Sequence, residues 1–219
     1  MARQKAPKLG RPPKGLAGDV ETRILDAAEH LFLGKGYRSS SIDEVAERAP
    51  ASKPTIYSHF SGKEGLFEAV VARAVGGLAN FEGYTPEGRT IQDKLTNIGA
   101  VIVERALQDS VGITRAVIAE APTFPDLSRH VHETSRDRIA EAVSRVLSDA
   151  THLSRNLKGP FSAKRSIPTA QIFMDLILLP MLMRSLLGED SKALKKDLVP
   201  FVRERVGFFL AACEADWTN

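Results

Sequence analysis

A stretch without acidic side chains carries the groups best suited to chemistry in this 219-residue chain. From Arg48 to Lys63 there is no Asp or Glu, while the basic and hydroxyl side chains include Arg48, Lys53, His59, Lys63, Ser52, Thr55, Tyr57 and Ser58. Donors without neighbouring negative charge suit the phosphates and base edges of DNA. The sequence has no G-x-S-x-G, no G-x-G-x-x-G and no zinc-binding cysteine pattern, so we expect no enzyme, no cofactor and no metal site.

Two short helices are predicted to position these donors. The first is indicated by apolar residues that recur on one face at helical spacing: Ile42, Val45, Ala46 and Ala49. Ser41 and Glu44 fit the S-x-x-E capping box at its start. The second is predicted at about 53–59, with Ile56 and Phe60 packed inward because they are four residues apart. Together they are typical of a helix-turn-helix.

Inward packing of Ile56 and Phe60 leaves one face of the second helix for DNA. The side chains expected to face outward are Lys53, Pro54, Thr55 and Ser58. Lys53 can donate to guanine O6 or N7, and Pro54 or Thr55 can contact a thymine methyl group. The expected phosphate contacts, which set position and not sequence, are Tyr57, His59 and Lys63. The alternative is a helical hairpin of some other all-α protein whose polar face is merely solvated.

Helical patterns fill most of the remaining chain. We expect a first helix from about Asp19 to a stop at Gly34 and Gly36. Further helices are predicted at about 63–80, 91–108, 111–121, 125–152, 168–188 and 192–214. No segment alternates with a period of two, so the predicted fold class is all-α.

Residues 1–18 are rich in basic residues, Pro and Gly, and are predicted to form a flexible arm. Gly10-Arg11-Pro12-Pro13-Lys14 resembles the Gly-Arg-Pro core of AT-hook peptides. A narrow A·T-rich minor groove attracts arginine, so we hypothesise that Arg11, with Lys14, enters the groove beside the main site. The alternative is a disordered tail that adds solubility or nonspecific charge.

The composition is that of an ordinary globular protein, with 43% apolar and 26% charged residues. A net charge of +3 is mild, so any nucleic-acid contact depends on local charge placement. The single cysteine, Cys213, is compatible with a reducing cytoplasm. The most apolar segment, 172–187, is interrupted by Asp175, Pro180 and Arg184, so we expect no membrane span. The predicted location is the cytoplasm.

The segment RILDAAEHLFLGKGYRSSSIDEVAERAPASKPTIYSHFSGKEGLFEAVV closely resembles the DNA-binding domain of TetR/AcrR-type transcriptional regulators. The resemblance covers roughly 20–71 and is carried by Ile24-Leu25-Ala27-Ala28, Phe32, Gly36-Tyr37, Ser41 to Ala49, Ser52 to Phe60 and Lys63-Glu64. It implies an N-terminal three-helix DNA-binding domain at 19–65 and a helical effector-binding and dimerisation domain at 66–219. VIAEAPTFPDL, at 117–127, is similar to a stretch found in one C-terminal subgroup.

The resemblance also implies which residues contact DNA. The recognition helix and its start supply Ser52, Lys53, Pro54, Thr55, Tyr57, Ser58 and His59. Lys63 matches a phosphate-contacting lysine at the start of the fourth helix, and Ser41 matches a hydroxyl residue that opens the second. Pro50 departs from the family, whose turn usually holds Gly. Because the proline ring excludes positive φ, we expect the second helix to end a residue early.

The resemblance implies a ligand-responsive homodimer, most simply a repressor, that a small apolar effector releases from a pseudo-palindromic operator. The residues expected to line the effector pocket are Ile98, Ile102, Glu120, Phe124, Phe173 and Ile177. The last two helices are the most apolar, and a helix apolar on all sides must be covered on all sides. The residues expected to form the homodimer interface are Leu179, Met183, Leu198, Val202 and Phe209.

Two other classes of protein stay open. A small helical enzyme with a DNA-binding head would need convergent titratable groups in a cavity. An architectural protein that uses only the basic arm would bind random and operator DNA equally. The sequence does not choose between repressor and activator, and it names neither the effector nor the operator.

Overall fold

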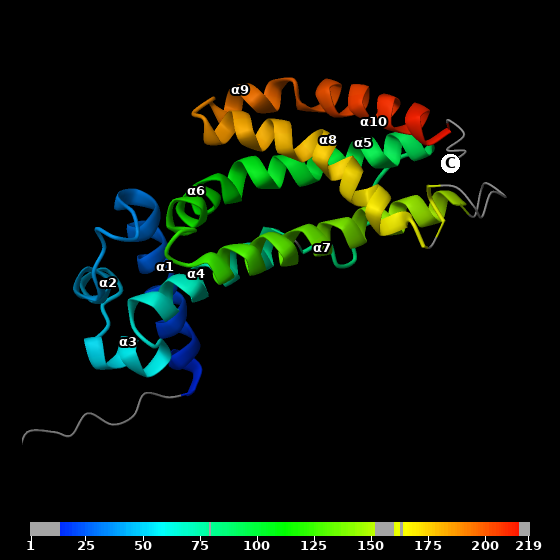
Figure 1. Ribbon diagram of the computed structural model, residues 1–219. Coiled ribbons are helices and arrows are strands. Elements are labelled where there is room, and N and C mark those ends of the chain that lie inside the picture. Colours follow the sequence, from blue (N-terminus) through cyan, green and yellow to red (C-terminus); the bar gives the residue numbers. More distant parts are fainter. Residues whose placement is uncertain (1–13, 79, 152–159, 163, 215–219) are drawn as a thin grey trace, which may run out of the picture. The chain divides into compact units, whose positions relative to one another are not determined.

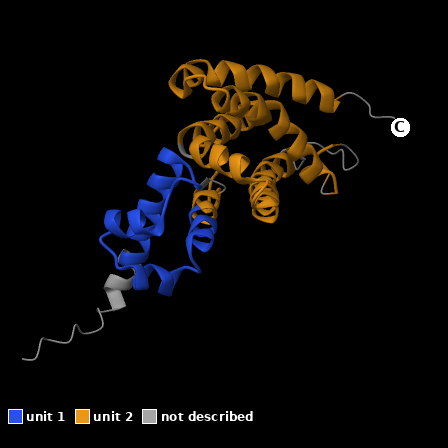
Figure 2. Cartoon of the chain, turned by 60° about the vertical axis from the view of Figure 1, so that its left-hand side comes forward, with its two compact units in different colours: residues 1–70 blue, residues 71–219 orange. Residues whose placement is uncertain are grey.

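The computed structural model describes residues 14–78, 80–151, 160–162 and 164–214, and no strand occurs within those ranges. The all-α prediction is therefore confirmed for them. The chain divides into two compact units, shown in Figure 2, which we call the N-terminal unit (Met1–Val70) and the C-terminal unit (Val71–Asn219). The division falls inside helix α4, Lys63–Leu78, a few residues after the predicted boundary at 65/66.

The N-terminal unit holds α1 (Lys14–Lys35), α2 (Ile42–Arg48), α3 (Lys53–His59) and the start of α4. Helix α1 begins five residues before the expected Asp19, directly after Pro13, because no helix breaker as strong as proline lies between them. It ends as predicted at Gly36, which has φ 88 and whose N–H donates to the Phe32 carbonyl at 3.1 Å.

An aromatic cluster forms the centre of the N-terminal unit. Phe32 of α1 and Phe67 of α4 meet edge to face, with ring centroids 5.5 Å apart, and Tyr37 lies 4.9 Å from Phe67. Ile56 of α3 is fully buried, and Phe60, which ends α3, is nearly so. The predicted inward packing of these two residues is confirmed, and it fixes the rotation of α3 about its axis.

The turn between α2 and α3 corrects the expectation for Pro50. We expected positive φ to be closed to proline, but Pro50 has φ 26. The cause is the way α2 ends: the N–H of Ala51 donates to the Ala46 carbonyl at 3.1 Å, and this Schellman closure needs a residue of positive φ in between. Helix α2 stops at Arg48 and Ala49 caps it, and an end earlier than in the family stays a prediction.

The C-terminal unit continues with α5 (Ile91–Arg105), the π-helical turn η1 (Ala106–Ser110), α6 (Val111–Glu120), α7 (Pro125–Thr151), α8 (Ser166–Leu186), α9 (Ser191–Lys196) and α10 (Leu198–Glu214). Helix α5 packs against α7, α8 and α10 (Figure 1). Gly99 makes the close approach possible: a Cβ there would lie 2.9 Å from Val202 Cγ1 and 3.0 Å from Ile177 Cδ1.

Two predicted boundaries in this unit are wrong. We expected a break near Ser110, but the chain passes from α5 into α6 through η1, and Val111 keeps helical angles of φ −57 and ψ −45. We expected one helix at 192–214, but the chain forms α9 and α10 with Asp197 between them. Pro200 explains the interruption, because it has no N–H for the Lys196 carbonyl and its ring would clash there.

Helix α8 is long and apolar enough to cross a membrane by length and composition alone. Eight of its residues, however, are buried inside the C-terminal unit. Arg136 of α7 also forms a two-bonded ion pair with Asp175 of α8, with distances of 3.0 and 3.1 Å. Core packing therefore accounts for the buried side of α8, while Ile172, Leu179 and Met183 remain exposed.

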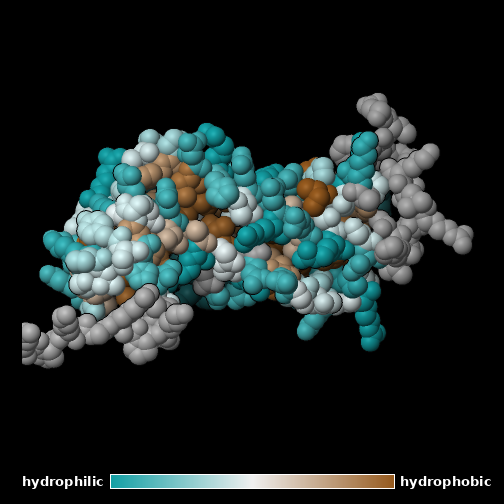
Figure 3. Space-filling model, turned by 90° about the horizontal axis from the view of Figure 1, so that it is seen from below, coloured by the Kyte–Doolittle hydropathy of each residue, from teal (hydrophilic) through white to brown (hydrophobic). Residues whose placement is uncertain are grey.

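In Figure 3, brown hydrophobic side chains reach the surface in patches among teal hydrophilic ones.

Replacing Pro50 with glycine is expected to stabilise the N-terminal unit. Glycine accepts positive φ and supplies the missing N–H, which removes about 1–3 kcal/mol of strain. The greater freedom of the unfolded chain offsets about 0.4–1 kcal/mol of this gain. We expect Pro50→Gly to raise the melting temperature by about 2–4 °C in thermal denaturation followed by circular dichroism.

Pro50→Ala is the matched control for this substitution. It removes the ring but keeps a Cβ, so it should gain less than glycine. A glycine variant that melts at or below the wild-type temperature would contradict the assignment of strain to this turn.

Candidate nucleic-acid interface

Helix α3 presents one polar face to solvent. Lys53, Pro54, Tyr57 and Ser58 are exposed, and Tyr57 keeps 58% of its surface accessible. Thr55 is half-buried, while Ile56 on the opposite side is completely covered. The expected outward-facing set is thus placed together on one side, except that Thr55 is only partly accessible. An exposed helix of this kind has the dimensions to enter a major groove.

The hydroxyls of α3 bond to one another and to the backbone. Ser52 is the N-cap, and its Oγ accepts from the Thr55 N–H at 3.2 Å while sharing a 2.7 Å hydrogen bond with Thr55 Oγ1. Ser58 Oγ donates to the Thr55 carbonyl at 2.7 Å. These bonds hold the first turn of α3 in shape. Ser52 therefore has a structural role that the sequence interpretation as a DNA contact did not include.

Lys53, the expected base contact, is paired within the protein. Its Nζ lies 2.6 Å from Oδ1 of Asp43, which belongs to the first turn of α2. The hydrogen bond to Asp43 and its negative charge raise the pKa of Lys53 above the ordinary value, so the side chain is cationic at neutral pH. Both side chains remain more than half exposed, and the ammonium is still open to solvent.

The residues at the end of α3 and the start of α4 are tied to neighbouring segments of the N-terminal unit. His59 Nδ1 lies 3.8 Å from Oε2 of Glu21 on α1. Lys63 Nζ donates to the Arg38 carbonyl at 3.2 Å and lies 4.3 Å above the Tyr37 ring. These contacts position the His59 and Lys63 side chains before any DNA is present.

Ser41 opens α2 in the predicted capping box. Its Oγ lies 3.3 Å from the Glu44 N–H, and Glu44 Oε2 accepts from the Ser41 N–H at 2.9 Å. Lys35 also donates to Glu44. The bonds from Lys35 and then Ser41 hold the pKa of Glu44 below its ordinary value. Ser41 is exposed, so its position still allows a phosphate contact.

The proposed minor-groove arm lies mostly outside the described residues. Arg11 falls in the part of the chain that the structure does not describe. Lys14 is the first residue of α1, and its side chain also lies outside that description. The minor-groove contact stays a prediction.

The six predicted effector-pocket residues occupy different environments. Ile98, Ile102, Phe173 and Ile177 belong to the buried core of the C-terminal unit. Glu120 is buried and Phe124 is partly buried. The expected apolar pocket stays a prediction.

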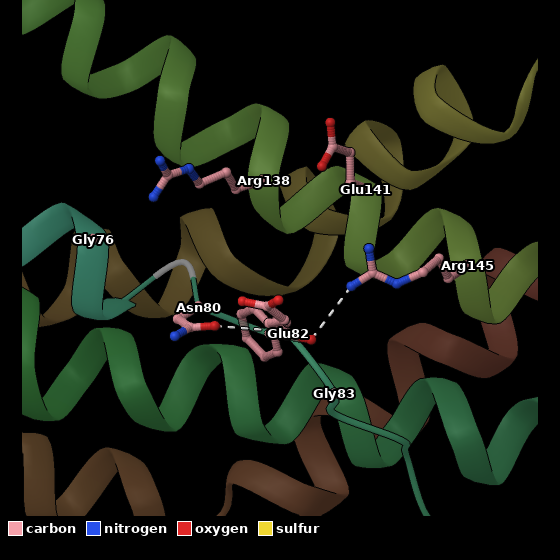
Figure 4. Close-up of a pocket in the computed structure, with 8 residues that line it drawn as sticks. Gly76, Asn80, Glu82, Gly83, Arg138, Glu141 and Arg145 are labelled. Atoms are coloured by element: carbon pink, nitrogen blue, oxygen red, sulfur yellow. Dashed lines mark hydrogen bonds between the residues drawn. The ribbon is translucent and has the colours of Figure 1, made fainter.

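A cavity of about 550 Å³ lies instead between α7 and the segment that follows α4. The residues that line it are Gly76, Asn80, Phe81, Glu82, Gly83, Arg138, Glu141 and Arg145 (Figure 4). Arg145 donates to the Phe81 carbonyl at 3.4 Å, and Asn80 Oδ1 accepts from the Glu82 N–H at 3.0 Å. Two guanidinium and two carboxylate groups thus surround a wall formed by Phe81, a lining suited to a small polar or charged molecule.

The predicted dimer residues divide into two groups. Leu179 and Met183 of α8 are exposed, as an interface requires. Leu198, Val202 and Phe209 of α10 are buried in the core of the same chain, so their assignment to an interface is corrected. Helix α10 packs against α5 and α8 within the chain.

The sequence interpretation missed the acidic partners and the charged cavity. Asp43 and Glu21 lie before the acid-free segment, and contacts between different helices leave no periodic signal in the sequence. Arg138, Glu141 and Arg145 do recur at spacings of three and four, but this pattern is equally typical of a solvated helix face.

Comparisons with known proteins agree with this geometry. Residues 24–70 match the family of bacterial regulatory proteins of the tetR type, and 93–215 match the AefR-like transcriptional repressor C-terminal domain. The regulator YvkB of Bacillus subtilis is 31% identical over 155 residues, covering 71% of this chain and 77% of that protein. The transcriptional activator FasR of Mycolicibacterium smegmatis is 30% identical over 139 residues, 61% of this chain and 63% of that protein.

Solved structures share the fold over nearly the whole chain. A TetR-family regulator from Mesorhizobium loti superposes with a TM-score of 0.75 at 23% identity, covering 90% of this chain and 97% of the other. The flavonoid-responsive regulator FrrA gives 0.65 at 22% identity, with 91% and 99% covered.

Proposed function

The chain belongs to the TetR family of bacterial transcriptional regulators, and from this premise we propose a homodimeric repressor that a small molecule releases from a two-fold symmetric operator. The observation that carries the proposal is the rotation of α3, which buries Ile56 and leaves Lys53, Pro54, Tyr57 and Ser58 exposed. The proposed location is the bacterial cytoplasm.

In the proposed complex, two copies of α3 enter successive major grooves, about one or more helical turns apart. Lys53 donates to a guanine acceptor, and the Thr55 methyl group and Pro54 approach a thymine methyl. Ser41, Tyr57, His59 and Lys63 bind phosphates and set the register. Such contacts need no rearrangement of the backbone, because caps and ion pairs already fix these residues in the free protein.

The proposed dimer face lies on α8 and α10, which contact each other. Its exposed apolar residues on α8 are Ile172, Leu179 and Met183, and on α10 Phe208, which leaves 71% of its surface open. On α8 the three residues follow spacings of seven and four, so they form one stripe. A stripe of large apolar side chains on one face indicates a protein–protein contact. On α10, Phe208 replaces the buried residues of the sequence interpretation.

The proposed effector site is the charged cavity beside α7. Arg138 can pair with an acidic group of the ligand. Gly76 of α4 also lines the cavity, and α4 begins at Lys63 beside the DNA-reading surface. A ligand that binds one position of α4 better than another would shift the population of DNA-binding states.

Alanine variants of two lysines separate base reading from phosphate contact. Lys53→Ala is expected to cost about 1–3 kcal/mol at one base pair of a duplex selected by the wild-type protein from a random pool. Lys63→Ala is expected to weaken binding to every sequence and to lower the salt slope by about 0.9. Fluorescence anisotropy titrations at several salt concentrations measure the loss of affinity and the salt slope. Lys192→Ala, which removes an exposed lysine of α9 in the C-terminal unit, is the control. The reverse pattern would show that α3 enters DNA in another register.

Dimerisation is tested by a charge on the exposed stripe. Leu179→Glu would bury two unpaired carboxylates, so we expect the dimer dissociation constant to rise about 100-fold or more. Leu33→Glu alters an exposed leucine of the N-terminal unit and should leave the dimer intact. Analytical ultracentrifugation distinguishes the two variants. A Leu179→Glu dimer as stable as the wild type would place the interface elsewhere.

The effector site is tested with acidic small molecules that raise the melting temperature of the wild-type protein. Arg138→Ala is expected to weaken such a ligand about 10-fold or more, the loss typical of a charged hydrogen bond. Arg129→Ala removes the same charge from α7 outside the cavity and serves as the control. In cells, the ligand should raise transcription from a reporter that carries the selected duplex, and Arg138→Ala should abolish the rise. A ligand that lowers transcription would indicate an activator.

A further inference from the structure

Asp43 places a fixed negative charge on the surface that is proposed to read DNA. It is the second residue of α2, and its side chain is 62% exposed. Its Oδ1 lies 2.6 Å from Nζ of Lys53, the first residue of α3. A carboxylate near phosphates is unfavourable for binding, so its presence at this position calls for a physical reason.

Stability does not supply that reason. Exposed ion pairs contribute little to folding because solvent and salt screen them. The start of α2 is already closed by the capping box of Ser41 and Glu44. The packing of α2 and α3 rests on Val45 and Ile56, which are almost fully buried. The effect of Asp43 therefore falls on the ammonium of Lys53.

Building on the proposed function, we propose that Asp43 is a specificity-determining residue: by holding Lys53 it withholds this cation from the phosphates of non-operator DNA while leaving it able to donate to a base in the operator. Asp43 touches no DNA in this arrangement and acts only through Lys53.

The chemistry of the ammonium group supports this division. Lysine has three N–H donors, so one can stay on Asp43 while another reaches a neutral acceptor such as guanine O6 or N7. A phosphate is different, because it offers Lys53 the same kind of charged partner that Asp43 already provides. If Lys53 exchanges the Asp43 carboxylate for a phosphate, it gains little binding free energy. If it keeps both partners, the carboxylate and the phosphate lie side by side and repel each other. Asp43 thus penalises the phosphate contact more than the base contact.

The test uses the full-length protein and two duplexes of equal length and composition. One duplex is selected by the wild-type protein from a random pool, and the other is its scrambled version. Asp43→Asn removes the charge that faces Lys53. Glu47→Gln removes an equal charge from an exposed position of the same helix and is the matched control. Both changes are also made in a Lys53→Ala background, and Asp43→Ser is a second variant at the same position.

We expect Asp43→Asn to raise affinity for the scrambled duplex about threefold, with a salt slope steeper by about 0.9, because one more phosphate contact forms. Affinity for the selected duplex should change less than twofold, so the ratio of the two affinities falls. Asp43→Ser should give the same loss of discrimination. Glu47→Gln should leave the ratio unchanged. In the Lys53→Ala background, Asp43→Asn should act no differently from Glu47→Gln.

Two results would overturn the inference. If Asp43→Asn raises both affinities equally, as a general loss of negative charge would, Asp43 has no part in discrimination. If its effect persists in the Lys53→Ala background, it does not act through Lys53. A third result, in which Lys53→Ala alone leaves both affinities unchanged, would overturn the proposed reading surface itself.

Discussion

Burial of Ile56 and Phe60 decides which side chains of α3 face solvent. Helix α3 has only seven residues, so its own hydrogen bonds are too few to hold it in isolation. Its orientation depends on these two side chains entering the core of the N-terminal unit, whose centre is the cluster of Phe32, Tyr37 and Phe67. When Ile56 and Phe60 are buried, the side chains on the opposite side of α3 must point toward solvent.

Around this constraint, short polar contacts complete the surface. Ser52 closes the first turn of α3, the carboxylate of Glu21 lies near His59 at its last turn, and the Arg38 carbonyl holds Lys63. Each contact is weak by itself, and each removes rotamer freedom that DNA binding would otherwise have to remove. Several weak polar contacts therefore order this surface, and all of them depend on the burial of Ile56 and Phe60.

The sequence alone predicted α2 and α3 to within a residue, because capping boxes and apolar spacing are local signals. The sequence did not predict features that depend on contacts between distant segments or on a single residue. Pro200 splits the last helix, and the packing of α10 against α5 and α8 buries Phe209 and leaves Phe208 exposed. The site was predicted as a set of donors, whereas the pairing of Lys53 with Asp43 depends on the angle between two helices, which no spacing encodes.

Gly99 has a mechanical consequence for the C-terminal unit. With no side chain there, Val202, Ile177 and Phe173 close in on the α5 backbone from α10 and α8. If one of these three helices slid along another, the side chains of Val202, Ile177 and Phe173 would collide with the α5 backbone at Gly99. The three helices therefore move together as one unit.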